Sequence, residues 1–274
     1  VFEPKTLFDL FPEDAKDCPT LKTQVAKDDL FWLAGESKSI KVPSWLMPKS
    51  LHNKGNYIIS LGELCQWISE KAMELGVDIF PGFPAQSYIK DESGRVNGIS
   101  TGDMGIDKEG NQKGTYTPGM DILAKQTIFA EGARGHLGKQ LIKEFNLDEG
   151  KTPQHFAIGF KEVWEVENDI HSAGDVVHTM GWPLNEGTTG GGFLYHFGNK
   201  RIAVGLIVDL NYTNPSHSPF QEFQQFKKHP KIKQFLESGK RVSYGARAIT
   251  KGGINSLVKM DFNGGMIIGC DAGT

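Results

Sequence analysis

The chain has 274 residues, which is enough for one large domain or two smaller ones. A hydrophobic fraction of 38%, a charged fraction of 23% and a formal net charge of −3 are typical of a globular protein. Without a basic stripe, this composition argues against nucleic acid as a partner. The cysteines Cys18, Cys65 and Cys270 lie far apart with no CxxC pair, which argues against a metal or iron–sulfur site held by this chain alone.

Residues 1–55 hold five prolines, so we expect them to be irregular. Two segments are nevertheless strongly apolar, and in the second Phe31, Trp32, Trp45 and Leu46 alternate with lysines. Trp beside Lys is typical of a membrane interface, although packing in a protein core would explain the same residues. No apolar run is long enough to span a bilayer. The sequence begins without Met, and we expect it to belong to a longer protein.

The middle of the chain alternates helix and strand patterns. Residues 61–76 repeat apolar side chains at helical spacing and end at Gly76. A short strand is expected in VDIFPG, residues 77–82, followed by a hairpin over residues 85–101 with its turn at Glu92–Gly94. Residues 127–130 predict a buried strand, which a glycine-bearing loop and a helix follow.

From about residue 151 the pattern becomes β. Four runs separated by turns predict an antiparallel sheet, and residues 220–238 predict a helical segment with Phe220, Phe223 and Phe226 on one face. A last buried strand is expected at residues 266–268. No GxSxG, HExxH or P-loop motif is present, and structural roles are expected for His178 and His196 in the β runs.

Two motifs resemble the flavin-contacting segments of flavoproteins. In the first, TIFAEGARGHLGKQL, an apolar strand runs into Glu131 and Gly132 directly before a helix. In the second, IIGCDAGT, a strand is followed by Gly269 and Asp271, where an aspartate would meet the ribityl chain of the cofactor. An ordinary strand–loop connection would explain either motif alone, but their occurrence in this order favours a flavin site.

The run GGG at residues 190–192 is not a dinucleotide fingerprint, because strand-forming residues and not a helix follow it and no cation adjoins it. A bulged strand entry would explain it. A functional alternative is a slot in which bare backbone meets a flat, neutral ligand between the side chains of Phe193 and Tyr195.

Together these motifs, with HTMGWPLNEGTTGGGFLYH and YGARA, resemble the electron-transfer flavoprotein–ubiquinone oxidoreductase family along the whole chain. The resemblance implies an α+β protein: an incomplete α/β FAD-binding domain of the two-dinucleotide type with an inserted antiparallel-sheet ubiquinone-binding domain. It implies FAD beside Glu131, Gly132, Gly269 and Asp271, although the family commonly has Ser at the last position.

For the quinone, the resemblance implies that the headgroup lies against Gly190 and Gly191. It also implies a membrane-embedded surface, which would contain Phe31, Trp32, Trp45 and Leu46. The expected division of the chain is a ubiquinone and membrane-surface segment at 1–55, part of the FAD domain at 56–150, the ubiquinone domain at 151–248 and a return to the FAD domain at 249–274.

The function implied by the resemblance is transfer of electrons from reduced electron-transfer flavoprotein, through FAD and a 4Fe-4S cluster outside this chain, to ubiquinone. The protein would be an FAD-dependent oxidoreductase bound peripherally to an inner membrane, at the mitochondrial matrix face or the bacterial cytoplasmic face. Alternatives are a related FAD-dependent reductase or monooxygenase of an isoprenoid or aromatic substrate, and a non-catalytic fragment that binds quinone or membrane.

Overall fold

The computed structural model describes residues 1–167, 169–184, 187–198 and 200–274. The chain divides into two compact units. Unit 1 comprises Val1–Asp78 and Ala157–Arg247, and unit 2 comprises Ile79–Phe156 and Ala248–Thr274. Residues 56–78, which we expected to lie in the FAD-binding part, are therefore grouped with unit 1.

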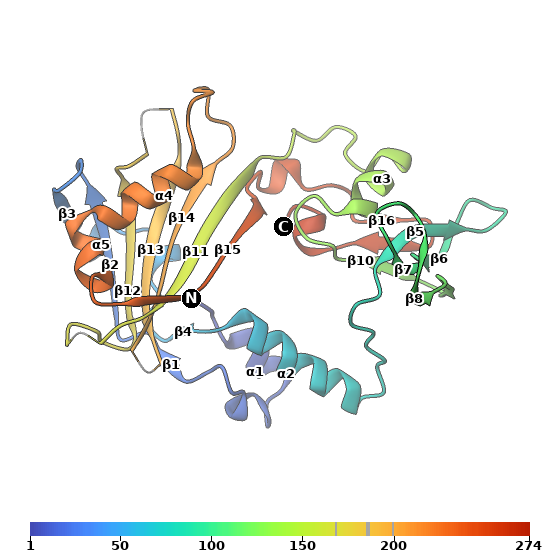
Figure 1. Cartoon of the computed structure of the whole chain (residues 1–274), viewed down its shortest axis with the longest axis horizontal. Helices are drawn as coiled ribbons and strands as arrows, with labels where there is room; N and C mark the ends of the chain where they lie inside the picture. The colour runs from blue at the N-terminus through green and yellow to red at the C-terminus, as the bar shows by residue number, and fades with distance from the viewer. Residues whose placement is uncertain (168, 185–186, 199) are drawn as a thin grey trace. The chain divides into compact units, whose positions relative to one another are not determined.

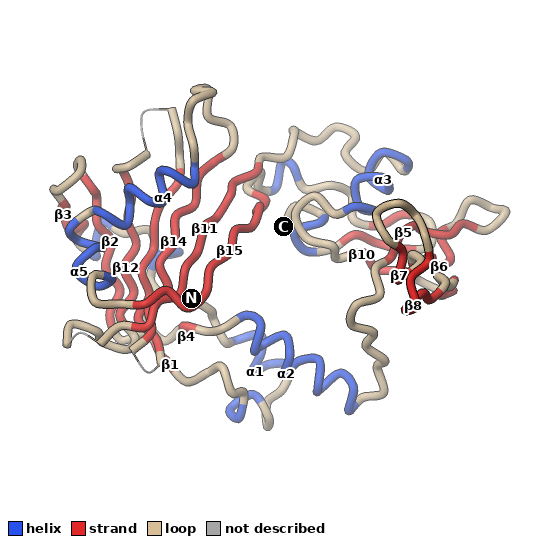
Figure 2. The backbone as a smooth tube through the Cα atoms, in the orientation of Figure 1, coloured by secondary structure: helices blue, strands red, loops and turns tan. Residues whose placement is uncertain are grey.

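Unit 1 is built on a seven-stranded sheet in the order β15-β11-β14-β13-β12-β2-β3 (Figures 1 and 2). Its strands are β2 (Lys27–Leu33), β3 (Ser39–Val42), β11 (Phe156–Glu165), β12 (Asp175–Gly181), β13 (Gly190–Phe197), β14 (Arg201–Asp209) and β15 (Lys240–Thr250). The four predicted β runs form β11 to β14, and their neighbouring pairs are antiparallel. The exception to antiparallel order is β12, which pairs in parallel with β2.

The expectation that residues 1–55 are irregular was wrong for residues 27–42. Strand β2 lies between β12 and β3, and its Phe31 and Leu33 are buried while Trp32 is 48% exposed. Successive side chains of a strand point to opposite faces, so one face of β2 joins the core and the other does not. We had expected Phe31 on a membrane-facing surface, and this was wrong, because its side chain lies in the core.

Two helices cover one face of this sheet, α4 (Pro219–Lys228) and α5 (Pro230–Leu236) (Figure 1). Helix α4 begins where the Ser218 hydroxyl accepts the Gln221 N–H and Pro219 occupies the first turn. It buries Phe223 and Phe226, whereas Phe220 is half exposed. The core between sheet and helices contains Phe31, Leu33, Val166, Val177, Leu194, Ile202, Val204, Leu206, Val208, Phe223, Phe226, Ile232 and Leu236.

One buried carboxylate on strand β11 binds side chains of helix α4 and of the neighbouring strand β15. Glu162 of β11 is 3% exposed and lies 2.9 Å from Lys227 Nζ and 3.1 Å from Arg241 Nη1. Trp164 Nε1 also donates to it at 2.9 Å. These cations and donors hold the pKa of Glu162 below its usual value against the opposing effect of burial.

The rest of unit 1 is a small helical layer. Helix α2 (Leu61–Glu74) confirms the predicted amphipathic helix and starts at Ser60, whose hydroxyl accepts the Glu63 N–H. Its Leu64 and Trp67 pack on Leu7 of α1 (Lys5–Leu10) and on Cys18. The short strands β1 (Thr23–Gln24) and β4 (Tyr57–Ile58) pair antiparallel beside this layer.

Unit 2 contains three small sheets, with orders β10-β17-β16, β5-β6-β9 and β7-β8. Their strands are β5 (Ala85–Lys90), β6 (Val96–Thr101), β7 (Met104–Ile106), β8 (Gln112–Thr117), β9 (Asp121–Leu123), β10 (Thr127–Phe129), β16 (Asp261–Phe262) and β17 (Gly265–Ile267). Helix α3 (His136–Glu144) follows β10 as predicted, and the hairpin over residues 85–101 is confirmed. The strand predicted in residues 77–82 was wrong, since those residues form a turn and loop.

The packing of helix α4 on the sheet predicts the cost of one glycine substitution. A Cβ at Gly192 would overlap the Phe226 ring and lie 2.6 Å from Thr179 Oγ1. Overpacking of this kind typically costs about 1–3 kcal/mol. We therefore expect Gly192→Ala to lower the free energy of unfolding by that amount in urea denaturation, and Phe226→Leu to cost less in that background than in the wild type. Equal costs of Phe226→Leu in both backgrounds would contradict the proposed contact.

Candidate functional site

The glycine run forms the first three residues of β13. A Cβ at Gly190 would overlap the carbonyl oxygen of Ile207 on β14, and a Cβ at Gly191 would lie 2.8 Å from the carbonyl oxygen of Thr179 on β12. With Gly192 against Phe226, each glycine therefore has a neighbour within the fold that excludes a side chain. No bulge interrupts the register of β13 with β14 in the described pairs. A bulged strand entry, one of the two explanations considered above, therefore does not account for the glycines.

The backbone at Gly190 and Gly191 is less enclosed on the side of β12. The register of β12 with β13 runs from Val176–Tyr195 to Thr179–Gly192 and ends there. Among the described residues, the two glycines before that point pair only with β14. The Thr189 carbonyl accepts the Asp209 N–H of β14, and strand residues alternate in the side to which their backbone groups point, so those of Gly191 face β14 and those of Gly190 face the β12 side. The β12-facing backbone of Gly190 is therefore a place where another molecule could bind.

A pocket of about 550 Å³ opens at this end of the sheet. It is lined by Trp32, Leu33, Ala34, Gly35, Met180, Gly181, Trp182, Leu184, Gly187, Thr188, Thr189 and Gly190. Gly190 thus lies in the wall, whereas Gly191 lies next to it along β13. The volume and the aromatic walls are typical of a small-molecule site.

Most of the residues that line the pocket were not predicted as site residues from the sequence. Trp182 and Leu184 belong to the loop after β12, and Trp32 reaches the pocket only because β2 pairs with β12 at Trp32–Met180. Gly181 allows this approach, because a Cβ there would lie 3.2 Å from Trp32 Cε2. The run TMGWPL at residues 179–184, shortly before the glycines, was the available sequence indication.

Exposed apolar side chains continue from the pocket along the edge of the sheet. Trp32 of β2 lies opposite Ile40 of β3, and Trp45 and Leu46 follow in the next turn. Their exposed fractions are 48%, 60%, 79% and 57%. We call these four residues the edge surface. Of the four predicted membrane-facing residues, Trp32, Trp45 and Leu46 belong to it and the buried Phe31 does not.

The histidines of the β runs are held inside the sheet. His178 Nε2 lies 2.9 Å from the Tyr195 hydroxyl, and its Nδ1 lies 3.6 Å from Asp28 Oδ1. Burial lowers the pKa of His178 and raises that of Tyr195. His196 Nδ1 accepts the Ser172 N–H, and burial, with a smaller contribution from His171, lowers its pKa to about 4. Both rings are therefore neutral near pH 7, with internal partners.

In unit 2 the two flavin-like motifs meet. Strands β10 and β17 are parallel neighbours with Phe129 opposite Ile267, so the residues that follow each strand emerge at the same edge. The Glu131 N–H donates to Asp271 Oδ2 at 3.3 Å. Asp271 is 7% exposed, and burial followed by the nearby Glu131 charge raises its pKa against the opposing backbone hydrogen bonds.

Glu131 also closes the start of helix α3. Its Oε2 accepts the N–H groups of Leu137 and Gly138, both at 2.8 Å. These donors would otherwise be available to a phosphate. Because a carboxylate of the chain itself occupies them, the start of α3 is not a free anion site.

Two glycines leave room beside these carboxylates. Gly132 and Gly269 have φ values of +86° and +63°, and a Cβ at either would meet no atom within 4 Å. A hollow of about 910 Å³ adjoins Glu131 and His136 and is also lined by residues of β5, β6 and the following loop. Bare backbone next to an open volume fits the approach of a flat cofactor such as a flavin.

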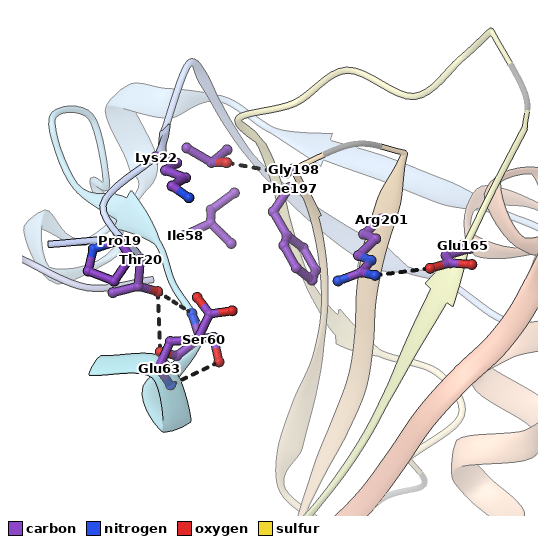
Figure 3. A pocket seen from close by; sticks show the side chains of 11 residues that line it. Pro19, Thr20, Lys22, Ile58, Ser60, Glu63, Glu165, Phe197, Gly198 and Arg201 are labelled. Carbon is purple, nitrogen blue, oxygen red and sulfur yellow. Dashed lines mark hydrogen bonds and ion pairs between the residues drawn. The ribbon is translucent and has the colours of Figure 1, made fainter. Parts of the chain in front are cut away.

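A further pocket of about 450 Å³ lies in unit 1 near Phe197 (Figure 3). Several of the polar groups drawn there bind one another: Arg201 Nη2 lies 3.1 Å from Glu165 Oε1, and the Ser60 N–H donates to the Thr20 hydroxyl at 2.9 Å. The first bond lies within the large sheet, and the second joins the segment before β1 to the start of α2.

Outside positions 168, 185, 186 and 199, no three His, Cys, Asp or Glu side chains are grouped so as to hold a metal ion. In the same part of the chain, no helix is long and apolar enough to cross a membrane.

Comparison with known proteins gives one match to part of the chain and others along its whole length. Residues 156–249 match the family model for ETF-QO, ubiquinone-binding. The whole chain is 57% identical over 275 residues to the electron transfer flavoprotein-ubiquinone oxidoreductase of Pseudomonas aeruginosa and covers 50% of it. Against the mitochondrial protein of that name from Homo sapiens the identity is 45%, over 99% of this chain and 44% of that protein. The chain spans about half the length of the curated relatives that it matches.

Solved structures with a similar fold are more distant in sequence. A geranylgeranyl bacteriochlorophyll reductase-like protein from Thermoplasma acidophilum has a TM-score of 0.65 at 16% identity, over 94% of this chain and 58% of that one. A flavoprotein/dehydrogenase from Cytophaga hutchinsonii has a TM-score of 0.59 at 14% identity, over 99% and 61%. These likenesses confirm the predicted α+β fold class. Over its whole length, the chain is similar to about half of the electron transfer flavoprotein-ubiquinone oxidoreductases named above.

Proposed function

We propose that the protein containing this chain transfers electrons from reduced electron-transfer flavoprotein through FAD to membrane ubiquinone. The observation that carries the proposal is the aromatic pocket at Gly190, most of which lies within the segment that matches the ubiquinone-binding family model. Unit 1 would hold the quinone and unit 2 part of the FAD. A 4Fe-4S cluster, which the family implies, would be held outside this chain.

The pocket suits a quinone headgroup. The rings of Trp32 and Trp182 and the side chain of Leu184 supply apolar walls, and the β12-facing backbone of Gly190, with the bare Gly191 beside it, would supply polar groups. Backbone N–H groups would stabilise negative charge that develops on a quinone oxygen during reduction. The neutral His178 and His196 have internal partners, so the chain's contribution is positioning and electrostatics.

The edge surface would hold the protein at the membrane. Indole and aliphatic side chains at this exposure are typical of proteins that lie in the interface without crossing it. Trp32 belongs both to the edge surface and to the pocket wall, so an isoprenoid tail could pass from lipid to the pocket beside it. The location would be an inner membrane, on the matrix or cytoplasmic face.

For FAD, the residues after β10 and β17 fit the cofactor. Gly132 and Gly269 would let the ring system approach the backbone, and Asp271 would accept a hydrogen bond from a ribityl hydroxyl. Glu131 would fix the loop by capping α3 rather than by touching phosphate. Bound FAD would supply the redox chemistry, taking up electrons from the partner flavoprotein and passing them on.

The alternative of an isoprenoid or aromatic reductase shares this fold, as the Thermoplasma protein illustrates. Its 16% identity supports the fold alone, whereas the relatives at 45–57% identity carry the quinone oxidoreductase name. Reduction of such a substrate without quinone activity would favour the alternative.

Filling the quinone pocket should weaken quinone binding. Gly190→Val is unsuitable because its side chain would collide with β14, but Ala34 is exposed at the pocket mouth. We expect Ala34→Trp to raise the KM for ubiquinone by at least about tenfold, a loss of about 1.4 kcal/mol of binding, with unchanged flavin content. Ser37→Trp adds the same side chain outside the lining and should leave KM near the wild-type value. Equal KM values in both variants would remove the pocket from the mechanism.

Removing the most exposed members of the edge surface should release the protein from membranes. Burying a side chain of this size contributes about 1–2 kcal/mol when it is partly exposed beforehand. Trp45→Ser with Leu46→Ser should therefore weaken partitioning to lipid vesicles by about 2–4 kcal/mol, roughly 30- to 1,000-fold, in a flotation assay. The matched variant Leu75→Ser with Leu123→Ser also removes two exposed apolar side chains and should have little effect. Similar losses in the two double variants would argue against a specific surface.

The raised pKa of Asp271 predicts a pH-dependent effect on stability. Because the pKa of Asp271 is higher in the folded protein than in the unfolded chain, folding favours the protonated carboxyl. The stability that this contributes is fully present below the pKa of the unfolded chain and is lost as the pH rises through the pKa of the folded protein. Asp271→Asn keeps an acceptor for the Glu131 N–H without the charge. Relative to the wild type, we expect its melting temperature to rise at pH 7 and the gain to vanish below about pH 4, the ordinary aspartate pKa. A gain independent of pH would refute burial as the cause.

A further inference from the structure

Three lysines from three elements surround one buried carboxylate at the edge of the large sheet. Asp29 of β2 is 8% exposed, with Lys41 Nζ of β3 at 2.7 Å and Lys27 Nζ at 3.3 Å. Lys231 of α5 places its Nζ 4.1 Å from the centroid of the Phe31 ring, two residues further along β2. Figure 1 shows α5 beside β2 and β3. We call Lys27, Lys41 and Lys231 the lysine cluster.

The cluster carries more positive charge than its carboxylate neutralises. The charged groups that act on Lys231 are Asp29, Lys27 and Lys41, so three amines share one carboxylate. Burial is the main cause that lowers the pKa of Lys231, and the two other amines add to it against the opposing effect of Asp29. The side chains of Lys27 and Lys41 remain 58% and 56% exposed. A further anion would be attracted to this place, and the amines are accessible to it.

The lysine cluster adjoins the edge surface. Lys41 lies opposite Phe31 and Ile40 lies opposite Trp32 in the β2–β3 pair. Because successive residues of a strand point to opposite faces, this edge presents lysines on the helix-covered face and apolar side chains on the other. Trp45 and Leu46 follow directly after β3. An edge with cations beside exposed apolar residues matches the boundary between lipid headgroups and acyl chains.

We propose that the lysine cluster binds the phosphate of anionic phospholipids and gives the membrane association of this protein a preference for anionic bilayers. The inference rests on the proposed membrane function of the edge surface and names its lipid class. The lysines line none of the three pockets described above, so a soluble anion would find no enclosure. At a bilayer the apolar residues would hold the phosphates within reach of the amines.

The test is co-sedimentation of the whole protein with vesicles of phosphatidylcholine alone and of phosphatidylcholine with phosphatidylglycerol. The informative variant is Lys27→Gln with Lys231→Gln, because Lys41 stays paired with Asp29 and no buried carboxylate is left without a cation. Each lysine near an anionic surface strengthens binding about fivefold. We expect a wild-type preference for the anionic vesicles and a decrease of roughly 25-fold in the variant, with binding to neutral vesicles unchanged.

Three further variants extend the test: one raises the net positive charge at the lysine cluster, one changes the charge elsewhere as a control, and one keeps the charges of the cluster. Asp29→Asn removes the neutralising charge and should increase the preference for anionic vesicles. Lys108→Gln with Lys113→Gln changes the net charge equally, at exposed positions of the β7–β8 hairpin of unit 2, and should not alter the preference. Lys27→Arg with Lys231→Arg keeps the charges and should restore the preference that the glutamines remove.

Distinct failures have distinct meanings. Wild-type protein that binds both kinds of vesicle equally overturns the lysine cluster as a lipid site but leaves the edge surface standing. Protein that binds neither kind overturns the membrane function itself. Inorganic phosphate that abolishes the preference at constant ionic strength would assign the cluster to a soluble anion and overturn the lipid proposal.

Discussion

The parallel pairing of β2 with β12 is the constraint on which the features of unit 1 depend. It runs from Lys27–Asp175 to Leu33–Gly181 and attaches a segment from near the start of the chain to the centre of the β region. This pairing sends Phe31 into the core under the helices and Trp32 into the pocket wall. It also places Asp29 where lysines of β3 and α5 can surround it. Without β2, the pocket would lack a wall and the sheet would end at β12.

The same pairing explains what the sequence could and could not predict. Helix α2 and the hairpin β5–β6 follow from local patterns, because their partners are a few residues away and their caps and turns are visible in the sequence. Each residue of β2 pairs with a residue 148 positions further along the chain, and the surrounding prolines suggested an irregular segment. Since a strand has two faces and the sequence does not say which is covered, Phe31 and Trp32 looked alike as interface residues.

The glycine run shows how one motif can serve packing and function at different positions. Gly192 makes room for Phe226 of α4, which is a packing requirement inside unit 1. Gly190 and Gly191 face neighbouring backbone, and their β12-facing edge lies beyond the last pair of that ladder. Glycine is therefore required at all three positions by the fold, and the proposed quinone contact uses backbone that the end of a strand pairing leaves accessible. Sequence alone could not separate these roles, because Ile207, Thr179 and Phe226 are distant along the chain.

Charge is distributed differently at the two proposed sites. In unit 2 the carboxylates of Asp271 and Glu131 are turned inward, onto the backbone N–H groups of the loop and of helix α3. They hold the loop in shape and leave bare glycine backbone for a ligand. At the edge of unit 1 the carboxylate of Asp29 is also buried, but the amines around it reach solvent. An inward carboxylate with outward cations leaves a positive edge beside apolar side chains, an arrangement that favours a charged, amphipathic surface over a small soluble ligand.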